Sequence, residues 1–78
     1  MRLFFAETDS HKFAIDQEEL TEVGRPENTE LNFHLYIWDK KSPEQSRDYL
    51  ENSLELAMEI AEEDFHLKQD AWIAATSA

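Results

Sequence analysis

The 78-residue sequence contains no cysteine, one glycine and two prolines. Without cysteine the chain can form neither a disulfide nor a thiolate metal site. One glycine does not supply a phosphate-cradling loop, and there is no P-loop, Rossmann glycine pattern, His-Glu-x-x-His motif or EF-hand loop. No apolar run is long enough to cross a membrane, and no signal peptide is recognisable near the start. We therefore expect a cytoplasmic protein without a cofactor or metal site.

Positive charge is also scarce. Seven lysines and arginines stand against 18 aspartates and glutamates, which gives a formal net charge of −11. Because nucleic acids are anions, this balance disfavours direct binding to DNA or RNA and favours a basic protein surface as the partner. An apolar fraction of 41% and an aromatic fraction of 12% favour a folded domain over an acidic disordered tail.

The chain length predicts one small domain, residues 1–78. In a domain of this size, a cleft deep enough for catalysis would compete with the core for the same apolar residues. We therefore expect a protein that is not an enzyme.

Residues 3–6 and 13–15 are short apolar segments on either side of a stretch with turn composition, which is typical of a β-hairpin. Residues 31–38 give the strongest strand signal, because apolar and polar positions alternate along them. This alternation predicts one core face, made of Leu31, Phe33, Leu35 and Ile37. Residues 16–30 are acidic and show a loop at 24–28; a short strand and a helical turn near Leu20 both remain open.

A helix start is indicated at Ser42, with proline at the first helical position and Gln45 completing a capping box. No glycine or proline follows Pro43, so the pattern predicts a helix to about Phe65 or beyond. The fold class that we expect is α+β, with a three- or four-stranded antiparallel sheet built from the hairpin and strand 31–38. One long amphipathic C-terminal helix would pack on one face of this sheet.

An acidic row follows one side of that predicted helix at steps of three and four residues. Like charges at this spacing destabilise a helix by about 0.2–0.5 kcal/mol per pair, so the row costs more than solubility requires. This cost suggests a binding role. The predicted partner-binding residues are Glu44, Asp48, Glu51, Glu55, Glu59, Glu62 and Glu63.

In size and charge the chain is similar to the small acidic inhibitors that phages and plasmids encode against host nucleases and defence complexes. Some of these inhibitors imitate DNA. The resemblance implies a non-catalytic protein that binds and inhibits a basic, nucleic-acid-binding protein or complex. A narrower form of the hypothesis is an immunity-type or antitoxin-type partner of one nuclease.

A rival hypothesis rests on aromatic residues instead of acids. Tyr36 and Trp38 lie on the predicted outer face of strand 31–38, and Trp72 lies in the apolar C-terminal segment. Exposed aromatic residues often anchor protein interfaces. On this hypothesis the chain is a small assembly protein that forms a homodimer or docks into a larger complex. The alternative is that the C-terminal segment folds over Tyr36 and Trp38, which would make both of them core residues.

Overall fold

The structure is a computed structural model that describes residues 1–75, apart from the side chains of Pro26 and Asn28. The described chain forms five strands, one α-helix and two short 3-10 helices. In chain order these are β1 (Arg2–Glu7), β2 (His11–Glu22), β3 (Arg25–Asp39), η1 (Pro43–Gln45), β4 (Arg47–Glu51), α1 (Leu54–Phe65), η2 (Gln69–Ala71) and β5 (Ile73–Ala74). The coarse α+β prediction therefore holds.

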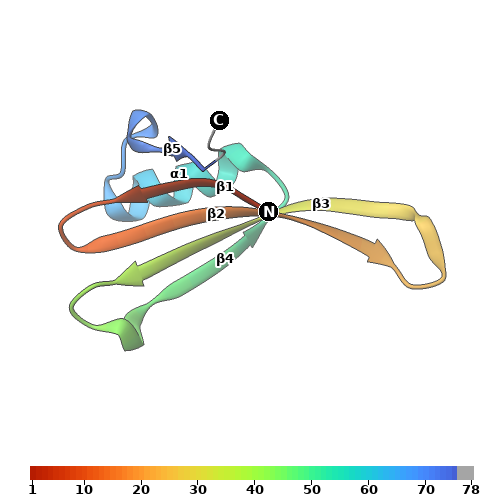
Figure 1. The fold of residues 1–78 in the computed structure, drawn as a ribbon, viewed down its shortest axis with the longest axis horizontal. Helices are drawn as coiled ribbons and strands as arrows, with labels where there is room; N and C mark the ends of the chain where they lie inside the picture. The colour runs from red at the N-terminus through yellow and green to blue at the C-terminus, as the bar shows by residue number, and fades with distance from the viewer. Residues whose placement is uncertain (76–78) are drawn as a thin grey trace.

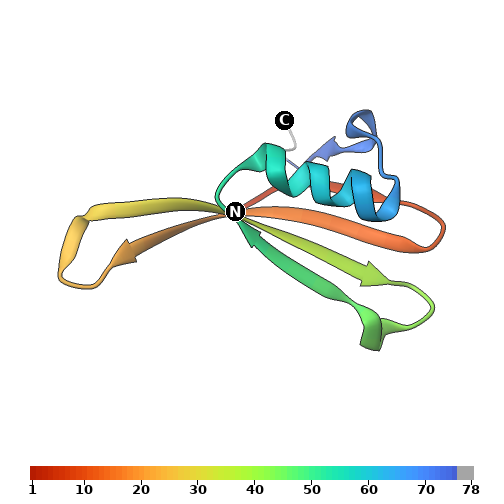
Figure 2. The ribbon, with the colours of Figure 1, turned by 180° about the vertical axis from the view of Figure 1, so that it is seen from behind.

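All five strands belong to one antiparallel sheet in the order β4-β3-β2-β1-β5, so the prediction of three or four strands is wrong. The first four strands are neighbours both in the sequence and in the sheet, so they form a meander. The predicted hairpin is present as β1 and β2, and the predicted strand 31–38 lies within β3. Helix α1 covers one face of the sheet and is seen in front of it in Figure 2.

The core lies between α1 and the inner part of the sheet. Leu35 and Ile37 of β3 are 0% and 2% exposed, which confirms that they face the core. Ala57 and Ala61 of α1 are fully buried above the sheet, and their small side chains let the helix approach it closely. The core contains Ala6, Phe13, Ile15, Leu35, Ile37, Ala57, Ala61 and Leu67.

The prediction of one long C-terminal helix beginning at Ser42 is wrong. Residues 43–45 form only the 3-10 helix η1, and residues 47–51 form β4. The side chain of Ser42 makes no capping hydrogen bond, and Ser46 leaves helical geometry with φ −62° and ψ 146°. The α-helix starts after Ser53 and ends at His66, which adopts φ 58°.

β4 forms because it completes one edge of the sheet. It pairs with residues 33–37 of β3, and Tyr49 lies opposite Leu35 and packs against the core. Without β4, backbone groups along this edge of β3 would have no strand partner. Helix propensity is a weak preference that such tertiary pairing overrides.

β2 and β3 continue together beyond the rest of the sheet. β1 pairs with β2 only as far as Asp16, and β4 pairs with β3 only over 33–37. Residues 18–32, which we call the arm, therefore form a two-stranded ribbon that projects away from α1 along the longest axis of the molecule (Figure 1). The predicted loop at 24–28 is wrong, since only Val23 and Gly24 form the turn and residues 25–28 belong to β3.

The prediction for Leu31 is confirmed for its face but not for its burial. Leu31 was expected on the core face with Leu35, and it does share that face. However, it is 43% exposed because it lies in the arm, where α1 does not cover the sheet.

Candidate functional site: the open face of the sheet

The sheet face opposite α1 has no described helix or strand over it, and we call it the open face (Figure 1). The strand register places Phe5, Ala14, Tyr36 and Asp48 in one row across it, because directly opposed residues of antiparallel strands share a face. Large exposed apolar side chains gather on this face. They are Phe5, Trp38, Leu50 and Ile73, which are 43%, 40%, 51% and 55% exposed.

Three aromatic side chains of β3 stack along the middle of the open face. The ring centroids of His34 and Tyr36 are 4.1 Å apart with an interplanar angle of 15°. Those of Tyr36 and Trp38 are 5.6 Å apart at 12°. We call these three residues the aromatic ladder. Strand geometry explains it, since residues two apart project from the same face at a spacing that aromatic rings can span.

Carboxylates from two neighbouring strands hold His34 at one end of the ladder. The Nε2 atom lies 2.8 Å from Asp48 of β4, and Nδ1 lies 3.2 Å from Glu18 of β2 and 3.2 Å from the Tyr36 hydroxyl. Desolvation by burial lowers the pKa of His34, but the hydrogen bonds to Asp48 and Glu18 outweigh it and the net pKa is raised. The arrangement therefore favours the imidazolium form.

The side chain of Arg2 lies beside Trp38, at the end of the aromatic ladder away from His34. The Arg2 guanidinium donates to both carboxylate oxygens of Asp16, at 2.8 and 3.5 Å. Its central carbon lies 6.0 Å from the centroid of the Trp38 ring, within the range of a cation–π contact. The open face thus already holds one guanidinium group between a carboxylate and an indole.

The Tyr36 hydroxyl is a poor acid at neutral pH. Desolvation raises the pKa of Tyr36, and the negative charges of Asp16, Glu18 and Asp48 raise it further. The Tyr36 ring therefore stays neutral at neutral pH, stacked between His34 and Trp38.

The predicted acidic row does not exist as one helix face. Glu44 lies in η1, Asp48 lies on the open face, and Glu51 lies opposite Phe33 on the face of the sheet that carries α1. The remaining predicted residues are exposed on α1: Glu55, Glu59, Glu62 and Glu63. Residues 44–51 do not form an α-helix, so side chains three and four residues apart in this segment do not share one face. A partner-binding role for these acids stays a prediction.

The predicted aromatic residues are also divided between the two faces. Tyr36 and Trp38 lie together on the open face. Trp72 packs against the core on the opposite side, where its ring meets Phe13 edge-on at 6.1 Å. As far as residue 75, the C-terminal segment therefore does not cover Tyr36 and Trp38.

Sequence reasoning did not identify Arg2, Asp16, Glu18 and His34 as members of the site. Alternation along 31–38 already placed His34 beside Tyr36 and Trp38. The partners of His34, however, come from β2 and β4, and they meet only through the strand register. No local pattern signals this register, because β4 has no strand signal of its own.

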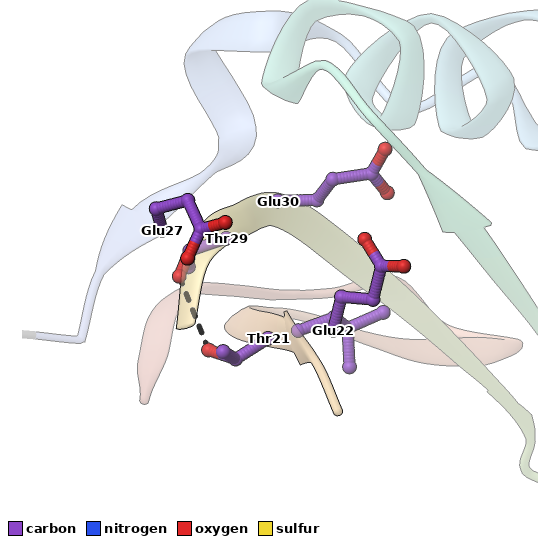
Figure 3. Close-up of a pocket in the computed structure, with 6 residues that line it drawn as sticks. Thr21, Glu22, Glu27, Thr29 and Glu30 are labelled. Carbon is purple, nitrogen blue, oxygen red and sulfur yellow. Dashed lines mark hydrogen bonds between the residues drawn. The ribbon is translucent and has the colours of Figure 1, made fainter. Parts of the chain in front are cut away.

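The described residues also form a shallow hollow at the arm. Figure 3 shows Thr21 and Thr29 joined through their hydroxyl groups at 3.1 Å, with Glu22 and Glu30 extending beside them. The hollow is lined by Leu20, Thr21, Glu22, Glu27, Thr29 and Glu30. Within residues 1–75, no group of three or more histidines and carboxylates is arranged to hold a metal ion.

Among the described helices, none has the length and apolar character needed to cross a membrane. Comparison with protein-family models, curated proteins and solved structures finds no match to this chain.

Proposed function

We propose that the protein is a non-catalytic binding module whose open face receives a basic segment of a partner protein. The observation that carries the proposal is the composition of this face. Exposed apolar side chains surround a stacked aromatic ladder, and carboxylates border it. Apolar patches with aromatic anchors and polar rims are typical of protein interfaces.

Charge decides between a basic partner and a second copy of the chain. The open face carries the carboxylates of Glu7, Asp16, Glu18 and Asp48, and its cationic groups are Arg2, Lys12 and the imidazolium form of His34. A symmetric dimer would bring together two chains that each carry a net charge of −11, which opposes self-association. A partner rich in arginine would instead meet complementary charge and aromatic rings.

The intramolecular contact of Arg2 supports arginine over lysine as the recognised group. A guanidinium pairs with a carboxylate through two parallel N–H groups and also stacks on aromatic rings, whereas an ammonium is a point charge. The pair of Arg2 with Asp16 beside Trp38 has this form.

Inhibition of a nucleic-acid-binding protein is the finer form of this proposal. It follows if the basic segment bound by the open face is the one that contacts nucleic acid. Imitation of a DNA strand is not part of it, because the continuous row of carboxylates that would imitate the phosphates is absent from the fold.

Two substitutions test which surface binds. Leu50 on the open face and Leu56 on α1 are exposed leucines, at 51% and 42%. Calorimetric titration with an arginine-rich decapeptide should give about fivefold or greater weakening for Leu50→Ala and no change for Leu56→Ala, as expected when only one leucine lies in the interface. Equal affinities of the two variants would refute the open face as the binding surface.

A lysine-rich decapeptide of the same charge tests the chemistry of recognition. We expect it to bind more weakly than the arginine-rich one, with a steeper loss on adding salt, because it has only the charge attraction. Concentration-dependent dimerisation that Leu50→Ala abolishes would support the assembly hypothesis in place of this one.

A further inference from the structure

The arm is a two-stranded ribbon with both outer edges uncovered by any described strand. β2 ends its pairing with β1 at Asp16, and β3 begins its pairing with β4 at Phe33. Between these points the two strands pair only with each other, through residues 18–22 and 25–32. An exposed strand edge presents backbone donors and acceptors that another extended chain can use.

Few apolar side chains are buried in the arm, which is held by backbone pairing and by side-chain contacts such as Thr21–Thr29 and Glu22–Arg25. Leu20 and Leu31 are nearly half exposed, and Val23 at the tip is 99% exposed. A two-stranded hairpin is marginally stable in water, and a third strand adds stability. The arm therefore gains from an added strand more than the inner sheet would.

The charge of the arm determines which strand it can accept. Five glutamates and one arginine lie within residues 18–32: Glu18, Glu19, Glu22, Glu27, Glu30 and Arg25. The internal register sets no two glutamates directly opposite each other, since Glu18 faces Asn32, Glu19 faces Leu31 and Glu30 faces Leu20. A second copy of the arm would add its own glutamates beside these. Like charges on neighbouring strands are destabilising.

Charged residues and proline on edge strands are common devices against self-association. In the arm every charge except Arg25 is negative, and Pro26 removes one backbone donor near the tip. The glutamates oppose pairing between copies but attract a strand with lysine or arginine at alternate positions, whereas the missing donor of Pro26 disfavours any added strand at that one position.

We propose that the arm is a site for β-strand addition, which binds a basic extended segment of a partner along an outer edge of residues 18–22 or 25–32. The backbone supplies the hydrogen bonds and the glutamates supply the selectivity for positive charge. This site uses the strand edges of the arm, meets the open face at Glu18, and does not depend on the function proposed above.

A pair of peptides tests the backbone contribution. The probe is a decapeptide of alternating lysine and valine, and its twin carries N-methyl groups on every second residue. The N-methylated peptide keeps the charge and side chains of the probe but lacks the backbone N–H donors along one of its edges. We expect the probe to slow amide hydrogen exchange within 18–32, and the twin to bind about tenfold more weakly because its edge cannot hydrogen-bond. Equal affinity of the two peptides would overturn strand addition and leave charge attraction alone.

Two double variants test the location, since each removes two exposed carboxylates. Glu19→Gln with Glu27→Gln changes the arm, and Glu55→Gln with Glu59→Gln changes α1. The first should weaken binding of the lysine–valine probe several-fold and the second should leave it unchanged, provided both melt like the parent. The reverse order would overturn the proposal. So would protection of the arm that grows with protein concentration in the absence of peptide, since a second copy would then occupy the edge.

The open-face variant separates this proposal from the previous one. Leu50→Ala should leave binding of the lysine–valine probe unchanged while it weakens binding of the arginine-rich peptide. If Leu50→Ala weakened binding of both peptides, one surface would bind both of them, and the arm would not be a separate binding site.

Discussion

The inner and outer parts of the β2–β3 hairpin share the same two strands but have different surroundings. In the inner part, Phe13 and Leu35 are buried beneath α1. In the arm, α1 does not cover the sheet (Figure 2), and Leu20 and Leu31 are nearly half exposed, although Asn32 at its base is buried. The comparison shows that strand geometry alone does not indicate stability, because burial against a second layer supplies most of it.

Leu35 and Leu31 give the largest expected contrast. They lie on the same strand and the same face, but Leu35 is fully buried and Leu31 is 43% exposed. Replacing Leu35 with alanine should lower the free energy of unfolding by about 2–5 kcal/mol, through lost burial and a cavity. Leu31→Ala should stay within about 0.5 kcal/mol of the parent. Urea denaturation measures both, and similar losses for the two variants would mean that the arm is as well covered as the core.

Gly24 lets the arm be weakened without touching the core. Its φ is +81°, and a Cβ at this position would meet no atom within 4 Å. Gly24→Ala should therefore destabilise the arm by about 1–2 kcal/mol through backbone strain alone. The adjacent and fully exposed Val23→Ala is the control. Native-state hydrogen exchange should become faster in residues 18–32 and stay unchanged in residues 33–37; faster exchange throughout would mean that arm and core unfold as one unit.

His34 marks the boundary between the two parts, since Glu18 belongs to the arm and Asp48 to β4. The pKa of His34 is raised above the ordinary 6.5 in the folded state. Protonation therefore favours folding, so this stabilisation is complete below the unfolded pKa and is lost as the pH rises through the folded pKa.

Urea unfolding between about pH 6 and pH 9 should show a decline in the parent that His34→Gln lacks. An equal decline in both proteins would assign the effect to other groups. NMR titration of the imidazole measures the pKa directly.

The smallest expected effect concerns the outer side of α1, which is exposed like the arm although its inner side covers the core. Glu59 lies one turn from both Glu55 and Glu63. Glu59→Lys should raise the free energy of unfolding by a few tenths of a kcal/mol per new pair, or about 0.2–0.5 kcal/mol each. If the α1 acids bind the partner, as the sequence predicts, this stable variant should also lose affinity for the arginine-rich peptide. Unchanged affinity would exclude them.

Much of the inner sheet could be predicted from local pattern. Alternation along 33–38 separated Leu35 and Ile37 from His34, Tyr36 and Trp38, since side chains of a strand alternate between faces. The candidate site was predictable only in part, because the contacts of His34 with Glu18 and Asp48 join three strands.

The prediction failed where the backbone of a segment could either form a helix or pair with the sheet. Residues 43–51 follow a good helix-starting pattern, but pairing with β3 satisfies an exposed strand edge and brings Tyr49 onto the core. In the arm, a loop was predicted at 24–28 and the structure near Leu20 was left open, because the charged residues there obscure the alternation that a two-stranded ribbon keeps.

The sequence by itself determined the periodicity of its apolar residues, its net charge and therefore the sign of the surface that it presents. Only the tertiary structure decided that residues 47–51 are a strand, that one sheet face stays open and that the acids are divided among α1, the open face and the arm. The physical reason is that periodicity and charge are properties of neighbouring residues. Strand pairing depends instead on which strand edges and apolar faces the rest of the chain leaves uncovered.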